Sequence, residues 1–168
     1  MPKRRELRNL IADLRLATVG SGELNARIIC AVLAPEGAYV RQSRINGAWC
    51  VYSGSDPRSG RPRVWSPAVP IQAPSGSIDD AVRLVREALP DHRVHLNISM
   101  GGRREVGASL STDPDSASAH LMRPRHDDLG PGYGMEGGLR TAATAPIAIV
   151  LALLEALITQ LRENADVG

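Results

Sequence analysis

A chain of 168 residues has the size of one domain, long enough to bury well over half of the surface that its unfolded form exposes. Hydrophobic residues make up 43% and charged residues 23%, which argues against disorder along most of the length, and a formal net charge of +2 is too small to identify a nucleic-acid-binding protein. With no Phe, three Tyr and two Trp, the core must be built from aliphatic side chains, which suits helices packed on a sheet.

The chain opens with two helical patterns. In residues 6–19, Leu7, Leu10 and Leu14 fall on one helical face, which predicts a first helix. Gly20 to Gly22 interrupt it, and residues 23–33 predict a second helix that stops before a proline. The opening is therefore a helical hairpin or one bent helix.

Alternating residues 38–52 predict a β-hairpin with Asn46 and Gly47 as a two-residue type I′ turn. Residues 53–76 are rich in Gly and Pro and predict a long loop. Trp65 is the large apolar residue of this loop, and we expect it to fasten the loop to the core.

The next pattern combines a helix and a second hairpin. Ser77 can cap a helix over residues 78–89. Residues 93–100 alternate cleanly, and Gly101 and Gly102 can turn the chain back into residues 103–111.

The last third predicts a loop and a buried helix. Residues 112–138 are dense in Asp, Ser, Gly and Pro, which predicts a long mobile loop. Thr144 can cap a final helix that is apolar on most sides and reaches Leu161. Such a helix must be enclosed by its own domain or by a second copy, and we expect a homo-oligomer, most simply a dimer.

The elements together predict a single α+β domain over residues 1–168. Its antiparallel sheet of two hairpins would pack with the N-terminal helices, the middle helix and the long C-terminal helix. Cys30 and Cys50 lie in apolar surroundings without C-x-x-C spacing, which predicts buried reduced thiols. No signal peptide or clean membrane span is recognisable, so we expect a cytoplasmic protein that does not bind a membrane.

Four segments in this order resemble the phage ABA sandwich family of small phage and prophage proteins: residues 22–28, 77–81, 94–96 and 144–149. The resemblance spans roughly residues 7–161. It implies an α/β/α sandwich and dimers in which the C-terminal segments are buried, and it carries no settled catalytic residues. The sequence departs from the family in its long insertions at residues 53–76 and 112–138.

Few residues of the sequence form patterns typical of catalytic or metal-binding sites. His120, His126, Asp127 and Asp128 are the nearest approach to a metal site, but they lie among Gly and Pro without a framework, so we expect no metal. Residues 130–138 lack the Lys-Ser/Thr ending of a phosphate-binding loop. No nucleophile and base stand in a known motif, so we expect neither an enzyme nor a cofactor.

Ligand binding is the remaining class of function. The two long loops hold arginines and aromatic residues that could contact the phosphate and stack on the base of a nucleotide. The expected ligand-binding residues are Arg58, Arg63, Trp65, Arg123, Arg125 and Tyr133. No recognition helix carries a stripe of basic residues, which argues against a nucleic acid as partner.

Two functions follow from this composition. The first is a phage or prophage accessory protein that binds and sequesters a nucleotide messenger of host defence, with a cyclic nucleotide as ligand. The alternative is a protein-binding or structural accessory factor without a small-molecule ligand.

Overall fold

The computed structural model describes residues 2–55, 60–98, 117–127 and 130–166, with side chains for residues 4–55, 60–94, 96 and 142–165. The described residues form four helices and six strands. In chain order these are α1 (Pro2–Leu16), α2 (Gly22–Leu33), β1 (Tyr39–Gln42), β2 (Trp49–Ser55), β3 (Pro62–Trp65), α3 (Ile78–Ala88), β4 (Arg93–Ile98), β5 (Ala117–Asp127), β6 (Gly130–Ala142) and α4 (Ala145–Asp166).

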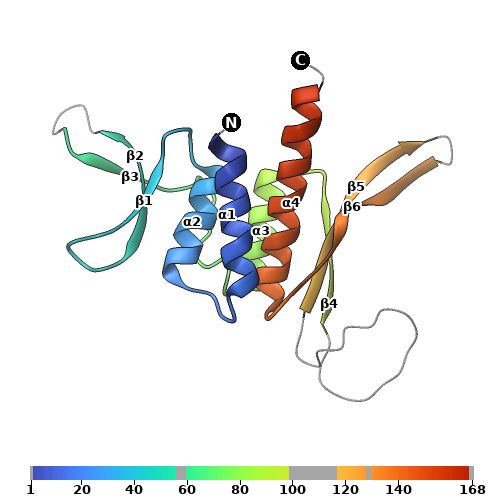
Figure 1. The fold of residues 1–168 in the computed structure, drawn as a ribbon, viewed down its shortest axis with the longest axis horizontal. Coiled ribbons are helices and arrows are strands. Elements are labelled where there is room, and N and C mark those ends of the chain that lie inside the picture. The colour runs from blue at the N-terminus through green and yellow to red at the C-terminus, as the bar shows by residue number, and fades with distance from the viewer. Residues whose placement is uncertain (1, 56–59, 99–116, 128–129, 167–168) are drawn as a thin grey trace.

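The α+β class is confirmed, but the strands form two separate antiparallel sheets instead of one. The first sheet has the order β1-β2-β3 and the second the order β4-β5-β6. Figure 1 shows the four helices side by side in the middle, with one sheet on each side of them. The expected layering of helices around one sheet therefore differs from the observed order, in which the helices lie between the sheets.

The central layer is held together by the aliphatic faces of the helices. Leu7, Leu10 and Leu14 of α1 are buried, as their spacing predicts, and Ser21 caps α2 by accepting a hydrogen bond from the backbone N–H of Leu24 at 3.2 Å. The third helix begins as predicted, because the Ser77 hydroxyl accepts from the N–H of Asp80. The three helices predicted in residues 6–19, 23–33 and 78–89 are thus confirmed within a few residues.

The C-terminal helix α4 is the centre of the core. Its residues 145–154 are all buried, and it contacts α1, α3 and the second sheet. Residues Ala145–Ala165 are long and apolar enough to cross a membrane; their most apolar stretch has a mean hydropathy of 1.7, and 67% of that stretch is buried inside the protein. Because one chain covers this helix, its apolar faces do not by themselves require a second copy.

The first hairpin is confirmed, but its turn is longer than the predicted one. Strands β1 and β2 pair as far as Gln42 and Trp49, and the N–H of Ser43 then donates to the Ala48 carbonyl at 2.7 Å. Four residues therefore form the turn, and the two-residue type I′ prediction is wrong. Gly47 does adopt the predicted positive φ, +70°, which lets the chain re-enter β2 without strain.

The segment between β3 and α3 is fastened to the helices by polar contacts. Asn25 of α2 accepts hydrogen bonds from the backbone N–H of Ser75 at 2.9 Å and from its hydroxyl at 2.7 Å. Asp80 accepts from the N–H of Ala73 at 2.9 Å. The predicted loop at residues 53–76 thus holds the end of β2, the short strand β3 and an anchored connection, and Trp65 packs against the core as expected.

The second sheet overturns the prediction of a loop at residues 112–138. Within the described residues, β5 and β6 are long paired strands that extend beyond β4, and Figure 1 shows this two-stranded ribbon projecting away from the helices. Backbone pairing between β5 and β6 offsets the low strand propensity of Gly and Pro in this ribbon. The strand predicted at residues 93–100 is confirmed as β4, but it pairs with β5, and its expected partner at residues 103–111 lies outside the described residues.

Candidate functional site

Aromatic and basic residues concentrate in the first sheet. Four of the five aromatic residues of the chain lie in residues 39–65. The same segment carries five arginines and a single acidic residue, Asp56, so it alone holds twice the formal net charge of the whole chain, which is +2. A sheet with aromatic side chains and excess positive charge is suited to bind an anion that carries a flat ring.

Two tyrosines form the centre of this surface. Tyr39 in β1 and Tyr52 in β2 are register partners, which places their side chains on the same face of the sheet. Their ring centroids are 5.6 Å apart and the ring planes differ by 20°, so the rings are stacked. Tyr39 is 41% exposed, and part of its aromatic surface is therefore available to a ligand.

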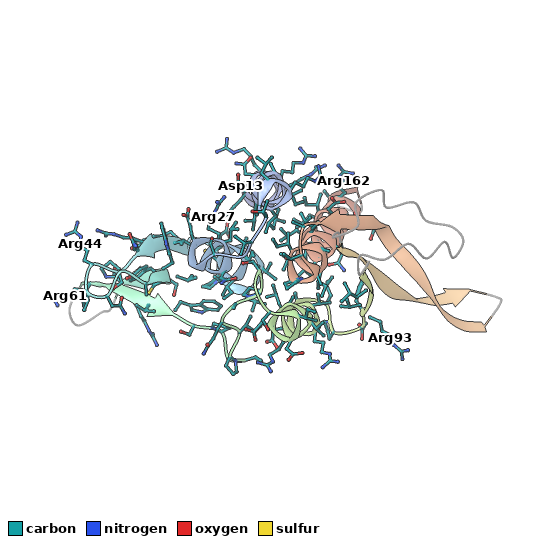
Figure 2. The ribbon with its side chains drawn as sticks, turned by 90° about the horizontal axis from the view of Figure 1, so that it is seen from below. Asp13, Arg27, Arg44, Arg61, Arg93 and Arg162 are labelled. Carbon is teal, nitrogen blue, oxygen red and sulfur yellow. The ribbon has the colours of Figure 1, made fainter. Side chains whose placement is uncertain are left out.

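The tyrosines line a groove of about 550 Å³, which we call the tyrosine groove. Three exposed arginines surround it: Arg41, Arg44 and Arg61. The remaining lining residues are uncharged: Gln42, Ser43, Ile45 and Pro62. Since none of the described residues that line this groove is acidic, the described lining carries a net positive charge, and Figure 2 shows Arg44 and Arg61 at the end of the sheet farthest from the helices.

Local backbone structure places each arginine. Arg41 is two residues from Tyr39 in the same strand, so both side chains face the same way. Arg44 lies in the four-residue turn, which Gln42 closes by donating from Nε2 to the Gly47 carbonyl at 2.8 Å. Arg61 follows Gly60, whose φ of +65° begins the return into β3. The groove is thus assembled from one strand, one turn and one strand entry.

A second groove of about 520 Å³ adjoins the first. It lies between α1, α2 and β1, and Tyr39 lines both grooves. We call it the α1–α2 groove; its polar lining residues are Arg5, Glu6, Asn9, Glu23 and Arg27.

Cys30 also lines the α1–α2 groove. Burial, and secondarily the charge of Glu6, raises the pKa of the Cys30 thiol above its ordinary value of 9.0. Both cysteines are free, as predicted; Cys30 is buried but Cys50 is only partly so.

A third groove of about 560 Å³ lies on the face of the first sheet that packs against α2. Trp49, Val51 and Trp65 line it, and none of its described lining residues is charged; we call it the tryptophan groove. A Cβ atom added to Gly22 would lie 3.6 Å from Cδ1 of Trp49, which shows how closely this face approaches the helix. The two faces of the sheet differ, since Val51 is buried on this side while Tyr52 stacks on Tyr39 on the other.

The structure does not gather the six residues expected to bind a ligand. Arg63 is exposed in β3, and Trp65 is partly buried against the core on the face opposite the tyrosines. The other side of the helices carries Arg123, Arg125 and Tyr133, in the β5–β6 ribbon, where Arg125 pairs with Gly132 and Pro124 with Tyr133. Arg58 lies outside the described residues.

Sequence reasoning missed the tyrosines, Arg41 and Arg44. The signal that could have found them is the clustering of aromatic residues with arginines on alternating strand positions of residues 39–65.

In the ranges that the structure describes, no group of three or more His, Cys, Asp or Glu side chains could hold a metal ion. Of the metal candidates weighed from the sequence, His120, His126 and Asp127 lie in β5. Asp128 lies outside the described residues.

Comparison of the chain with family models, with curated proteins and with solved structures finds no match. The function of the grooves therefore has to be inferred from their own chemistry.

Proposed function

We propose that this protein binds a nucleotide in the tyrosine groove and does so without catalysing a reaction. The observation that carries the proposal is the stacked pair Tyr39–Tyr52 bordered by three exposed arginines, with no acidic residue among the described lining residues. A nucleotide joins a flat base to a phosphate, and these are the two groups that such a surface attracts.

The magnitudes favour a base-bearing anion over a simple anion. Stacking a base on an aromatic side chain contributes about 1 to 3 kcal/mol. An exposed ion pair contributes at most about 1 kcal/mol, so the arginines alone would hold inorganic phosphate only weakly. A ligand that uses Tyr39 and the arginines together gains both terms, so it should bind at least about fivefold more tightly than by the arginines alone.

A role in sequestration is part of this proposal. Holding a nucleotide messenger out of solution requires affinity and no chemical step, and the resemblance to small phage proteins suggests a messenger of host defence as the ligand. A homo-oligomer would multiply the number of binding surfaces for each particle.

Calorimetric titration with adenosine, guanosine, cytidine and cyclic nucleotides tests the proposal. We expect Tyr39→Ala to weaken binding about fivefold or more, and Tyr39→Phe to retain it, because the ring and not the hydroxyl stacks on the base. Arg44→Ala and Arg61→Ala should each weaken binding up to about fivefold. Arg86→Ala is the matched control, since Arg86 is exposed on α3 and lines none of the three grooves. Wild-type protein that binds no nucleotide at millimolar concentration would refute the proposal.

A second candidate, a protein-binding accessory factor, is favoured by the tryptophan groove. Its described lining is mostly apolar and uncharged, and two of the chain's five aromatic side chains, Trp49 and Trp65, contribute to it. Nucleotide affinity separates the two candidates, because this groove has no arginine to hold a phosphate.

A further inference from the structure

The two grooves that meet at Tyr39 differ in charge. In the part of the chain that the structure describes, the tyrosine groove is lined by three arginines and no acidic residue, whereas the α1–α2 groove is lined by two arginines and two glutamates. Because Tyr39 lines both grooves, a ligand that stacks on its ring can reach into both. The phosphate and the base edge of one nucleotide can therefore meet different electrostatic environments.

The acidic side chains of the α1–α2 groove are available as acceptors. Glu6 and Glu23 are exposed, and both side chains line this groove. The guanidinium of Arg27, by contrast, donates to the Asp13 carboxylate, and Figure 2 shows these two side chains between α1 and α2. Because Arg27 is engaged by Asp13, the two glutamates can accept more hydrogen bonds from a ligand than the equal numbers of acidic and basic lining residues suggest.

These carboxylates repel a phosphate and attract hydrogen-bond donors. The exocyclic amino groups of cytosine, adenine and guanine are such donors, and Glu or Asp commonly accepts from the amino group of cytosine. Uracil and thymine present carbonyl oxygens at the equivalent positions, which the carboxylates disfavour.

We infer that the protein prefers nucleotides with an amino-bearing base, with the phosphate in the tyrosine groove and the base amino group at Glu6 or Glu23. This inference rests on the proposed nucleotide binding and names the class of base that the same surface selects. Asn9, which also lines the α1–α2 groove, supplies both a donor and an acceptor for the rest of the base edge.

Cytidine and uridine 5′-monophosphate are the matched probes, because they differ at one exocyclic position and have nearly the same size and stacking surface. We expect the cytidine compound to bind about fivefold more tightly to wild type, the lower end for a base-edge contact because the glutamates are exposed. Guanosine and inosine 5′-monophosphate, which differ by the 2-amino group, provide an independent pair.

The variants Glu6→Gln and Glu23→Gln keep the shape of each side chain and remove its charge. At least one of them should bring the cytidine-to-uridine affinity ratio towards one while leaving uridine binding equal or tighter, since a charge that repels phosphate is gone. A variant that merely disturbed the structure would weaken both ligands and lower the thermal midpoint. Glu87→Gln on α3 is the control, because Glu87 is exposed and lines neither groove.

The two levels of proposal fail in different ways. Equal affinity for cytidine and uridine compounds would overturn the base preference and leave nucleotide binding in place. A preference that survives both Gln variants would place base recognition elsewhere and also overturn the inference. If no nucleotide binds wild type, the proposed function itself fails, and the base preference fails with it.

Discussion

Replacing Gly20 by alanine should destabilise the protein by about 3 kcal/mol. A Cβ atom at this position would lie 2.5 Å from the Ser75 carbonyl oxygen, 2.6 Å from its carbonyl carbon and 2.7 Å from its hydroxyl. Ser75 is only 1% exposed, and both of its donors are bound by Asn25, so it cannot retreat without breaking buried hydrogen bonds. Overpacking costs about 1 to 3 kcal/mol, and leaving a buried donor unpaired costs about 1 to 3 kcal/mol.

Gly22→Ala is the matched control two residues away. An added Cβ would meet only Trp49, at 3.6 Å, which is ordinary contact, and Gly22 is the first residue of α2. A glycine replaced by alanine where the backbone permits it stabilises a protein by about 0.4 to 1 kcal/mol. The two substitutions should therefore have opposite signs.

Urea unfolding followed by circular dichroism and tryptophan fluorescence measures both variants. For a protein of this size, a loss of about 3 kcal/mol should also lower the thermal midpoint by roughly 6 to 12 °C. Gly20→Ala protein that unfolds at the same urea concentration as wild type, or at a higher one, would show that the contact with Ser75 relaxes freely and would refute the reasoning.

Three further predictions concern the core, the assembly and the thiols. Leu154→Asp should abolish soluble expression, because Leu154 is fully buried at the centre of α4, whereas Leu154→Ala should cost about 2 to 5 kcal/mol in urea unfolding. Sedimentation at micromolar concentration should give a dimer, as the family resemblance implies, and a monomer would contradict this. Cys50 should react with a thiol reagent well before Cys30 at pH 8, because Cys30 is buried and its pKa is raised. Since the folded-state pKa lies above the unfolded value, the Cys30 thiol stabilises the fold fully below about pH 9, and this contribution should decline at higher pH, where Cys30→Ala should flatten the stability profile.

The helices were predictable because their signals are local. The spacing of Leu7, Leu10 and Leu14, the cap Ser77, and the apolar composition of α4 act within a few residues of where they stand. The pairing of strands was not predictable in this way, since β4 pairs with β5, whose residues were expected to form a loop. A strand rich in Gly and Pro, such as β6, carries no local signal, and its structure depends on its partner and on α4.

The residue types of the candidate site could be predicted from the sequence, but its position in the fold could not. Arginines do lie beside aromatic rings in the first sheet, as expected. However, the two residues of this sheet that were expected to bind, Arg63 and Trp65, do not line the tyrosine groove. The stacking of Tyr39 on Tyr52 depends on strand register, which in turn depends on the length of the turn at residues 44–47. A two-residue turn at Asn46 would have joined different residues, and the tyrosines would not have been partners.

The first sheet is also where the fold can accommodate a binding surface. Within β1, β2 and β3, Val51 is the one buried residue, so these strands contribute little to the central core. Their attachment depends instead on packing against α2 and on the connection after β3, which Asn25 and Asp80 hold. The tyrosines and arginines of the tyrosine groove therefore do not weaken the core, because the stability of the core comes from α4 and the helices around it. Substitutions in the tyrosine groove should accordingly change affinity with little effect on unfolding, whereas changes at Gly20 or Asn25 act first on stability.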